Sequence, residues 1–310
     1  MLGALGGIST IWVVIGVGCL VAHWGLVGHS GRRLMSVLAF TVASPALLFA
    51  MMARASLEHV FSLTLVVSAL AVAVTAVVHV IIARLAFKAG PGALVIGSMA
   101  SMYTNAGNFG IPVALALLND ATWAASILLM QVAVLMPVIL VLLDAVRTRD
   151  ADAKPTLAHY LALPLRNPLT VGIVGGLVVN ITGVELPAVV WAPIDLIGGM
   201  AVPLMLMAFG VSLRLDPLPG RGEHSAHAWT TVALKVVVHP LVAYVLGLAF
   251  GMTGGELYAV VVLAALPAAQ NVYVVATRYR ESELLARDSV FWSTFLSIGS
   301  LLGIAALLGT

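Results

Sequence analysis

Charged side chains are scarce in this sequence of 310 residues, of which 9% are Asp, Glu, Lys or Arg and 61% are hydrophobic. A soluble domain carries about 25% charged residues. The scarcity therefore excludes an ordinary water-soluble domain and predicts an all-α protein that crosses a lipid bilayer several times. The small net charge of +2 gives no reason to expect a nucleic-acid partner.

Cysteine and catalytic motifs are also lacking. Cys19 is the single cysteine, so the chain has neither an intrachain disulfide nor a thiolate metal cluster. The sequence contains no HExxH motif, no paired aspartates within an apolar segment and no Ser/His pair at catalytic spacing. We therefore expect no catalytic residue, no metal ligand and no cofactor, which argues against an intramembrane enzyme.

The sequence instead consists mainly of ten apolar stretches of about 20 residues, the length that crosses a bilayer. They run approximately over Leu5–Val27, Arg33–Ala53, Leu63–Phe87, Pro91–Leu118, Thr122–Val146, Leu169–Thr182, Pro187–Leu213, Trp229–Met252, Glu256–Tyr279 and Leu284–Leu308. Residues 147–168 separate five stretches from the other five. We expect a first five-helix repeat over 1–146, a linker over 147–168 and a second repeat over 169–310.

Basic residues mark one side of the expected membrane protein. Thirteen of the 15 Lys and Arg residues follow the first, third, fifth, seventh or ninth stretch. They are Arg32, Arg33, Arg84, Lys88, Arg147, Arg149, Lys154, Arg166, Arg214, Arg221, Arg278, Arg280 and Arg287. The other side holds only Arg54, and Lys235 lies within the eighth stretch. Under the positive-inside rule, the basic loops and the linker face the cytoplasm of a bacterial inner membrane, and both termini lie outside.

Weak internal similarity relates the two halves. The matching pairs are Pro45 and Pro203, His79 and His239, and Asn108 and Asn271, separated by 158 to 163 residues. Three matches in order at nearly one offset indicate a repeat. Because each repeat holds an odd number of spans, the two repeats must have opposite orientations, a plan that secondary transporters use.

The fourth apolar stretch contains a polar interruption, MYTNAGNFGIPVALAL, over Met102–Leu117. It includes, in order, Tyr103, Thr104, Asn105, Gly107, Asn108 and Pro112. Gly and Pro loosen the backbone hydrogen bonding, and irregular backbone at membrane depth is tolerated only where it is buried in protein or lines a cavity. The pattern predicts a broken helix at a binding site.

The ninth stretch carries a corresponding interruption, ALPAAQNVYVV over Ala265–Val275, with adjacent amides at Gln270 and Asn271. Each break is expected to leave a half-helix, one beginning near Ile111–Pro112 and the other near Asn271, which suits an N-cap. Two helix N-termini with free N–H groups form a site for an anion. Neither break contains an acidic residue that would balance a cation, which favours a carboxylate. The simpler alternative is a pair of proline kinks whose amides bond between helices.

Lys235 lies about seven residues into the eighth stretch. A cation at the centre of a span costs roughly 2.5–3.5 kcal/mol. We expect Lys235 either to be a charge partner for the substrate or for an exchanging proton, or to extend to the cytoplasmic edge. Gln131, midway along the fifth stretch, either bonds a neighbouring helix or reaches the cavity.

Three motifs resemble the auxin efflux carrier family of membrane transporters along the whole chain. They are TNAGNFGIPVALAL (Thr104–Leu117), RNPLTVGIVGGL (Arg166–Leu177) and LPAAQNVYVVATRY (Leu266–Tyr279). The resemblance implies an architecture shared with bile acid:sodium symporters. Helices 1, 2, 6 and 7 would form a scaffold domain, and helices 3–5 and 8–10 a transport domain that moves as an elevator. Helices 4 and 9 would cross at their breaks, at the midplane. Val275 departs from the family pattern, since it stands where a partner for Pro112 is expected.

The resemblance and the residues together predict a secondary carrier for a small organic anion. The carboxylate would lie against the residues of the two breaks, and the resemblance places the crossover on Asn105, Asn108, Pro112, Gln270 and Asn271. An anion channel or a non-transporting sensor is the alternative. Coupling to H⁺, to Na⁺ or to neither stays open, and GxxxG spacings leave open a homodimer through the scaffold domain.

Overall fold

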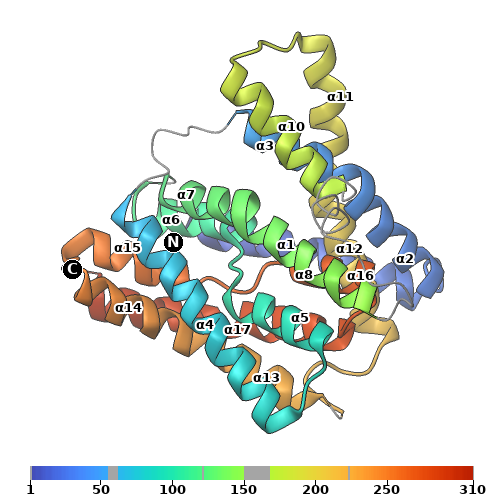
Figure 1. The fold of residues 1–310 in the computed structure, drawn as a ribbon. Coiled ribbons are helices and arrows are strands. Elements are labelled where there is room, and N and C mark those ends of the chain that lie inside the picture. The colour runs from blue at the N-terminus through green and yellow to red at the C-terminus, as the bar shows by residue number, and fades with distance from the viewer. Residues whose placement is uncertain (1, 55–61, 121, 150–167, 223, 310) are drawn as a thin grey trace.

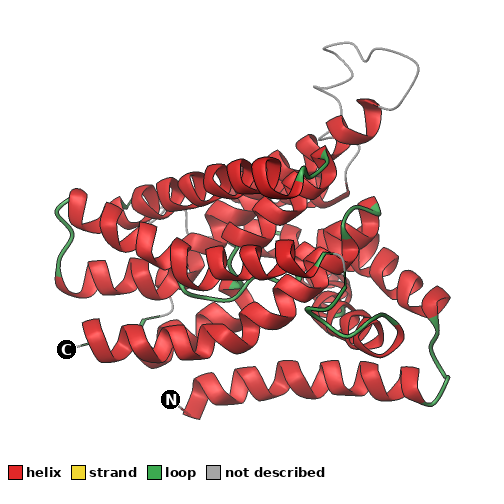
Figure 2. Cartoon of the chain, turned by 90° about the horizontal axis from the view of Figure 1, so that it is seen from below, coloured by secondary structure: helices red, strands yellow, loops and turns green. Residues whose placement is uncertain are grey.

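The structure, a computed structural model, describes residues 2–54, 62–120, 122–149, 168–222 and 224–309. Figure 2 shows that these residues form helices joined by loops, without a strand. The helices of the first half are α1 (Leu2–His23), α2 (His29–Leu38), α3 (Ser44–Ala53), α4 (Leu63–Phe87), α5 (Pro91–Met102), α6 (Ile111–Leu117), α7 (Thr122–Met130) and α8 (Met136–Arg149). Those of the second half are α10 (Pro168–Thr182), α11 (Ala188–Gly199), α12 (Ala201–Leu215), α13 (Ser225–Ala233), α14 (His239–Ala249), α15 (Gly254–Ala264), α16 (Asn271–Tyr279) and α17 (Glu283–Leu308). Most of the predicted linker, residues 150–167, lies outside the described residues.

Six helical segments within the described ranges are long and apolar enough to cross a bilayer. They are His29–Ala53, Leu63–Phe87, Thr122–Arg147, Ala188–Leu215, Ser225–Ala249 and Glu283–Leu308. Shorter apolar helices, among them α5, α10 and α15, occupy predicted stretches that are broken or short. Large apolar side chains are exposed along most of these helices, including Val77 and Leu85 on α4 and Val245 and Leu248 on α14. Such surfaces suit lipid, and the architecture is that of an all-helical integral membrane protein.

Four π-helical turns interrupt the long helices of the described chain. They are η1 (Ala39–Ala43), η2 (Ala106–Gly110), η3 (Gln131–Leu135) and η4 (Leu234–Val238), and the α-helices that follow them have Pro45, Pro112, Pro137 and Pro240 as their second residues. A proline lacks an N–H group, and its ring crowds the carbonyl group four residues earlier, so the turn before it widens. A π turn contains one extra residue and changes which side chains face the interior. Gln131 and Lys235 both lie in such turns.

The helices pack in two groups, with α16 between them. In the first, α1 and α2 pack on α12, and α3 packs on α10 and α11; we call this the α12 group. In the second, α4 packs on α5 and α14, α15 packs on α14, and α17 packs on α5 and α13; we call this the α14 group. Figure 1 shows α3, α10 and α11 on one side of the molecule and α13, α14 and α17 on another. The helix α16 contacts both α17 and α2.

Basic residues from alternate loops meet at one end of the molecule. They are Arg32, Lys88 and Arg280 around one cavity, and Arg33, Arg147 and Arg278 around a neighbouring one. Arg54 is the basic residue predicted on the opposite side. It follows α3 and makes two 2.8 Å hydrogen bonds to Asp195 of α11, which connect the end of α3 to α11. We call the end with the two basic cavities the charged end.

Candidate functional site

The two predicted breaks pair with each other through their backbones. Thr104 and Ala268 form an isolated antiparallel bridge. The hydrogen bonds run from the Asn105 N–H group to the Pro267 carbonyl, at 2.8 Å, and from the Ala269 N–H group to the Tyr103 carbonyl, at 3.1 Å. We call the paired segments, Tyr103–Asn105 and Pro267–Ala269, the crossover. Each break thereby satisfies peptide groups of the other, which lipid could not do.

Side chains reinforce the crossover. Asn105 Nδ2 donates to Gln270 Oε1 over 2.9 Å, and both residues are buried. Gln131 Nε2 donates to Thr104 Oγ1 over 2.5 Å, so Gln131 bonds the crossover, and it also lines a small cavity there. The Ala268 N–H group donates to Ser293 Oγ of α17 over 3.1 Å. Sequence analysis did not single out Ser293, because nothing distinguishes it from the other small polar residues of that helix.

Both half-helices lie close to their predicted starts. The α-helix of the first, α6, begins at Ile111 as predicted, and the π turn η2 extends helical geometry back to Ala106. The Asn105 carbonyl accepts from the Gly110 N–H group at 2.8 Å, and Pro112 becomes the second residue of α6. The second half-helix, α16, has Gln270 as its N-cap and Asn271 as its first residue, one position earlier than the prediction. In both cases the hydrogen-bonded crossover decides where helical geometry resumes.

Unpaired polar groups gather at the start of α16. The Tyr103 side chain is 1% exposed, and its hydroxyl group lies beside the Asn271 amide without meeting the geometry of a hydrogen bond. Asn271 also lines a cavity of about 30 Å³, which has room for about one water molecule. The facing wall comes from the α12 group and includes Phe40, Ser44 and Leu169. The N-terminus of α16 and the Asn271 amide therefore border this small space, and the buried Tyr103 hydroxyl group lies beside the same amide.

Asn108 and Gly107 lie on η2 rather than at the hydrogen-bonded core of the crossover. Asn108 is half-buried. A side chain added at Gly107 would meet Leu128 of α7 at 3.8 Å, an ordinary contact. At Gly110 the same addition would approach Leu266 Cδ1 of the other break to 2.8 Å. Gly110, which the predicted site omits, is therefore the glycine that the close approach of the two breaks requires.

Carboxylate groups do not line the cavities at the crossover among the described residues. The nearby donors are N–H groups, hydroxyl groups and amides. Such a site offers no counter-charge to a cation, whereas helix N-termini favour an anion.

Comparison with known proteins identifies the family of the chain. The family model described as Mem_trans, "Membrane transport protein", matches residues 5–305. The chain belongs to this family, that of the auxin efflux carriers. A protein of Rhizobium meliloti (strain 1021) named "Putative malonate transporter" is 26% identical to it over 307 residues, which cover 95% of this chain and 92% of the relative. The protein is a membrane transporter and not an enzyme.

In this member of the auxin efflux carrier family, Lys235 is fully buried rather than extended to the membrane edge. Its side chain is 0% exposed, and Nζ donates to the Ala264 carbonyl over 2.7 Å and lies 2.9 Å from His239 Nδ1. Ala264 is the last residue of α15, so the cation lies at the negative end of that helix. His239 lines a small cavity together with Thr104 and Gln131, which places the Lys235–His239 pair next to the crossover.

Proposed function

We propose that this protein is a secondary carrier of a small organic anion and that the carboxylate binds at the start of α16. The observation that carries the proposal is the buried Tyr103 hydroxyl group, unpaired beside Asn271 at a helix N-terminus. A donor at such depth in a membrane protein costs free energy unless a ligand uses it. The name of the Rhizobium meliloti relative supports a dicarboxylate such as malonate as the first substrate to test.

The transport cycle would be alternating access by an elevator movement. The packing of the helices supports this proposal, because the helices of each group pack mainly on one another. The α12 group meets the rest of the molecule at α16, at the point where α1 packs on α6, and at the point where Trp12 of α1 packs on Phe291 and Phe295 of α17. The α12 group would be the scaffold domain and the α14 group the transport domain. Their ten spans would form two inverted repeats, with the charged end in the cytoplasm and both termini outside, in a bacterial inner membrane. A homodimer would form through the scaffold.

Coupling would use H⁺ or Na⁺. The buried Lys235–His239 pair supports H⁺, since it can hold one more or one fewer proton beside the crossover. The carbonyl groups at the end of α5 would be the ligands for Na⁺. Uptake measured at two pH values, with and without a Na⁺ gradient, distinguishes coupling to H⁺ from coupling to Na⁺.

The experiment is uptake of radiolabelled malonate, acetate and phenylacetate by proteoliposomes, with wild type, Tyr103→Phe and Asn271→Ala. Tyr244→Phe, on a lipid-facing groove, is the matched control for the loss of a tyrosine hydroxyl group. We expect saturable uptake of at least one carboxylate and a KM raised about tenfold in each site variant, as for the loss of a charge-assisted hydrogen bond. Uptake that is undiminished in both site variants would contradict the assignment of the site. Unitary currents without saturation would favour an anion channel.

A further inference from the structure

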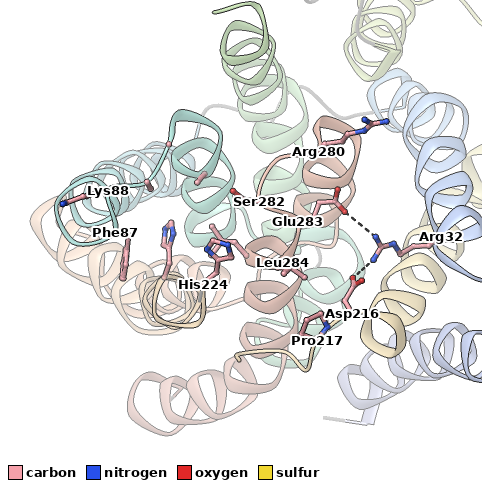
Figure 3. Close-up of a pocket in the computed structure, with 15 residues that line it drawn as sticks. Arg32, Phe87, Lys88, Asp216, Pro217, His224, Arg280, Ser282, Glu283 and Leu284 are labelled. Atoms are coloured by element: carbon pink, nitrogen blue, oxygen red, sulfur yellow. Dashed lines mark hydrogen bonds and ion pairs between the residues drawn. The ribbon is translucent and has the colours of Figure 1, made fainter. Parts of the chain in front are cut away.

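A large cavity lies at the charged end, between the two helix groups. Its volume is about 740 Å³. Arg32 of α2 and Asp216, which follows α12, come from the α12 group, whereas Glu283 of α17 comes from the α14 group. Figure 3 shows Arg32 between Asp216 and Glu283, with an interaction drawn to each.

The ion pairs here differ in length according to whether they cross between the groups. The pairs within a group are short: Arg32 contacts Asp216 directly, and Arg287 lies 2.6 Å from Asp288. The pairs that cross are long: Arg32 to Glu283 is 3.7 Å, and Arg287 to Asp216 is 3.9 Å. Among these ion pairs, separation of the two groups would therefore break only the long ones, and each arginine keeps an acidic partner on its own side.

This arrangement of short and long ion pairs suits arginine side chains that are largely shielded from water. The side chain of Arg287 is 1% exposed and that of Arg32 is 14% exposed. Removing the partner of a buried charge is strongly destabilising. Because the short pairs stay intact, separation leaves no arginine without a carboxylate.

Arg32 has hydrogen-bonding capacity to spare. Its Nε atom is buried without a partner, and Glu283 at 3.7 Å is too distant for a hydrogen bond. A guanidinium group binds carboxylates through several N–H groups at once. The Tyr273 side chain of α16 lies near Arg32, and α16 begins at Asn271, so the arginine lies next to the helix that starts at the crossover.

We infer that Arg32, Asp216 and Glu283 form a gate at the charged end, where the carboxylate of the substrate replaces Glu283 on Arg32. This inference rests on the proposed function, since it assumes an anion that passes between the cavity and the crossover. With no substrate, Glu283 holds the α14 group to the α12 group. An arriving carboxylate takes the free donors of Arg32, releases Glu283 and lets the two groups part.

Two measurements test the gate. The first is KM for malonate in proteoliposomes, for Arg32→Gln, Glu283→Gln and the exchange Arg32→Glu/Glu283→Arg. Arg33→Gln is the matched control, because Arg33 is an exposed neighbour on α2 that lies outside the ion pairs. The second is the labelling rate of Ser36→Cys by a membrane-impermeant maleimide, in a Cys19→Ser background. Ser36 is buried one turn beyond Arg32 on α2, so its labelling reports opening.

We expect Glu283→Gln to lower KM and to raise the labelling rate, each about fivefold, the factor for losing a partly exposed ion pair. Arg32→Gln should raise both KM and the labelling rate, because it removes the ion pair with Glu283 and the group that binds the substrate carboxylate. The exchange Arg32→Glu/Glu283→Arg should restore the slow labelling rate of the wild type but not its KM. If wild type carries malonate and Glu283→Gln changes neither quantity, the gate is overturned while the proposed function stands. If no carboxylate is carried, the proposed function fails. An unchanged labelling rate in Glu283→Gln would then show separately that the ion pair between Arg32 and Glu283 does not hold the two groups together.

Discussion

Lys235 Nζ lies 2.7 Å from the carbonyl oxygen of Ala264, so the buried amino group of one transmembrane segment binds the end of helix α15 in the next. The carbonyl groups in the last turn of a helix lack partners within that helix. At this depth lipid cannot supply one. The amino group of Lys235 thus stabilises the end of α15 just before the chain enters the crossover.

We predict that Lys235→Met lowers the thermal stability of the purified protein, by about 1–3 kcal/mol, because the Ala264 carbonyl and His239 lose their common partner. The measurement is thermal unfolding in detergent. Lys88→Met is the control, since Lys88 is a cation at the charged end outside this network. Equal melting temperatures for wild type and Lys235→Met would show that the contact contributes nothing to stability.

The two glycines of η2 should respond differently to the same substitution. Gly110→Ala places a methyl group 2.8 Å from Leu266 and 3.3 Å from the Asn105 carbonyl, whereas Gly107→Ala makes only a 3.8 Å contact. We expect Gly110→Ala to destabilise the protein by about 1–3 kcal/mol through overpacking and to abolish most uptake. Gly107→Ala should behave like wild type. The reverse order of effects would contradict the packing at the crossover.

Asn105 and Gln270 should act as one unit. Each single alanine variant leaves a buried amide without its partner, which costs about 1–3 kcal/mol. The double variant Asn105→Ala/Gln270→Ala should be little worse than either single one, because it removes both members of the pair together. A double-mutant cycle on melting temperatures measures this coupling. Strict additivity would show that the 2.9 Å contact is not energetically important.

Pro240→Ala tests the role of the π turn η4. Alanine restores the N–H group and allows a regular α-helix, which removes the extra residue and turns Lys235 away from Ala264. We expect uptake to fall about tenfold, as for a misplaced positioning group, and thermal stability to fall by about 1–3 kcal/mol, because the contact of Lys235 with the Ala264 carbonyl is lost. Pro203→Ala is the control, because Pro203 lies in α12, where no π turn precedes it within the described chain. Normal uptake by Pro240→Ala would show that the π turn is dispensable.

The sequence sufficed to predict the helical segments and both breaks, because long apolar runs and polar, proline-containing interruptions are strong local signals. It also predicted that the basic residues of alternate loops share one side, and cavities at the charged end bring six of them together. The α-helix α6 begins at Ile111 with Pro112 as its second residue, as predicted, whereas α16 begins one residue earlier than an N-cap at Asn271 would place it. The sequence did not predict the π turn η2, because that turn follows the backbone pairing of Asn105 with Pro267.

The partners of the polar residues could not be read from the sequence. Asn108 and Asn271 match in the repeat, yet the structure pairs Asn105 with Gln270 instead. The depth of Lys235 in its span left its orientation undecided, because one extra residue in a π turn rotates every later side chain. Roles in binding the substrate stay predictions for all nine site residues.

The crossover has a consequence for the assembly of the chain during synthesis. Tyr103 and Asn105 belong to the first half, and the backbone groups that complete them, on Ala269 and Pro267, are translated much later. Until the second half inserts, the nascent first half must hold unpaired peptide groups at the depth of the bilayer. Completion of the crossover would therefore act as a late quality-control step, and a chain that stops before α15 should be retained by the insertion machinery or degraded rather than accumulate as a folded half.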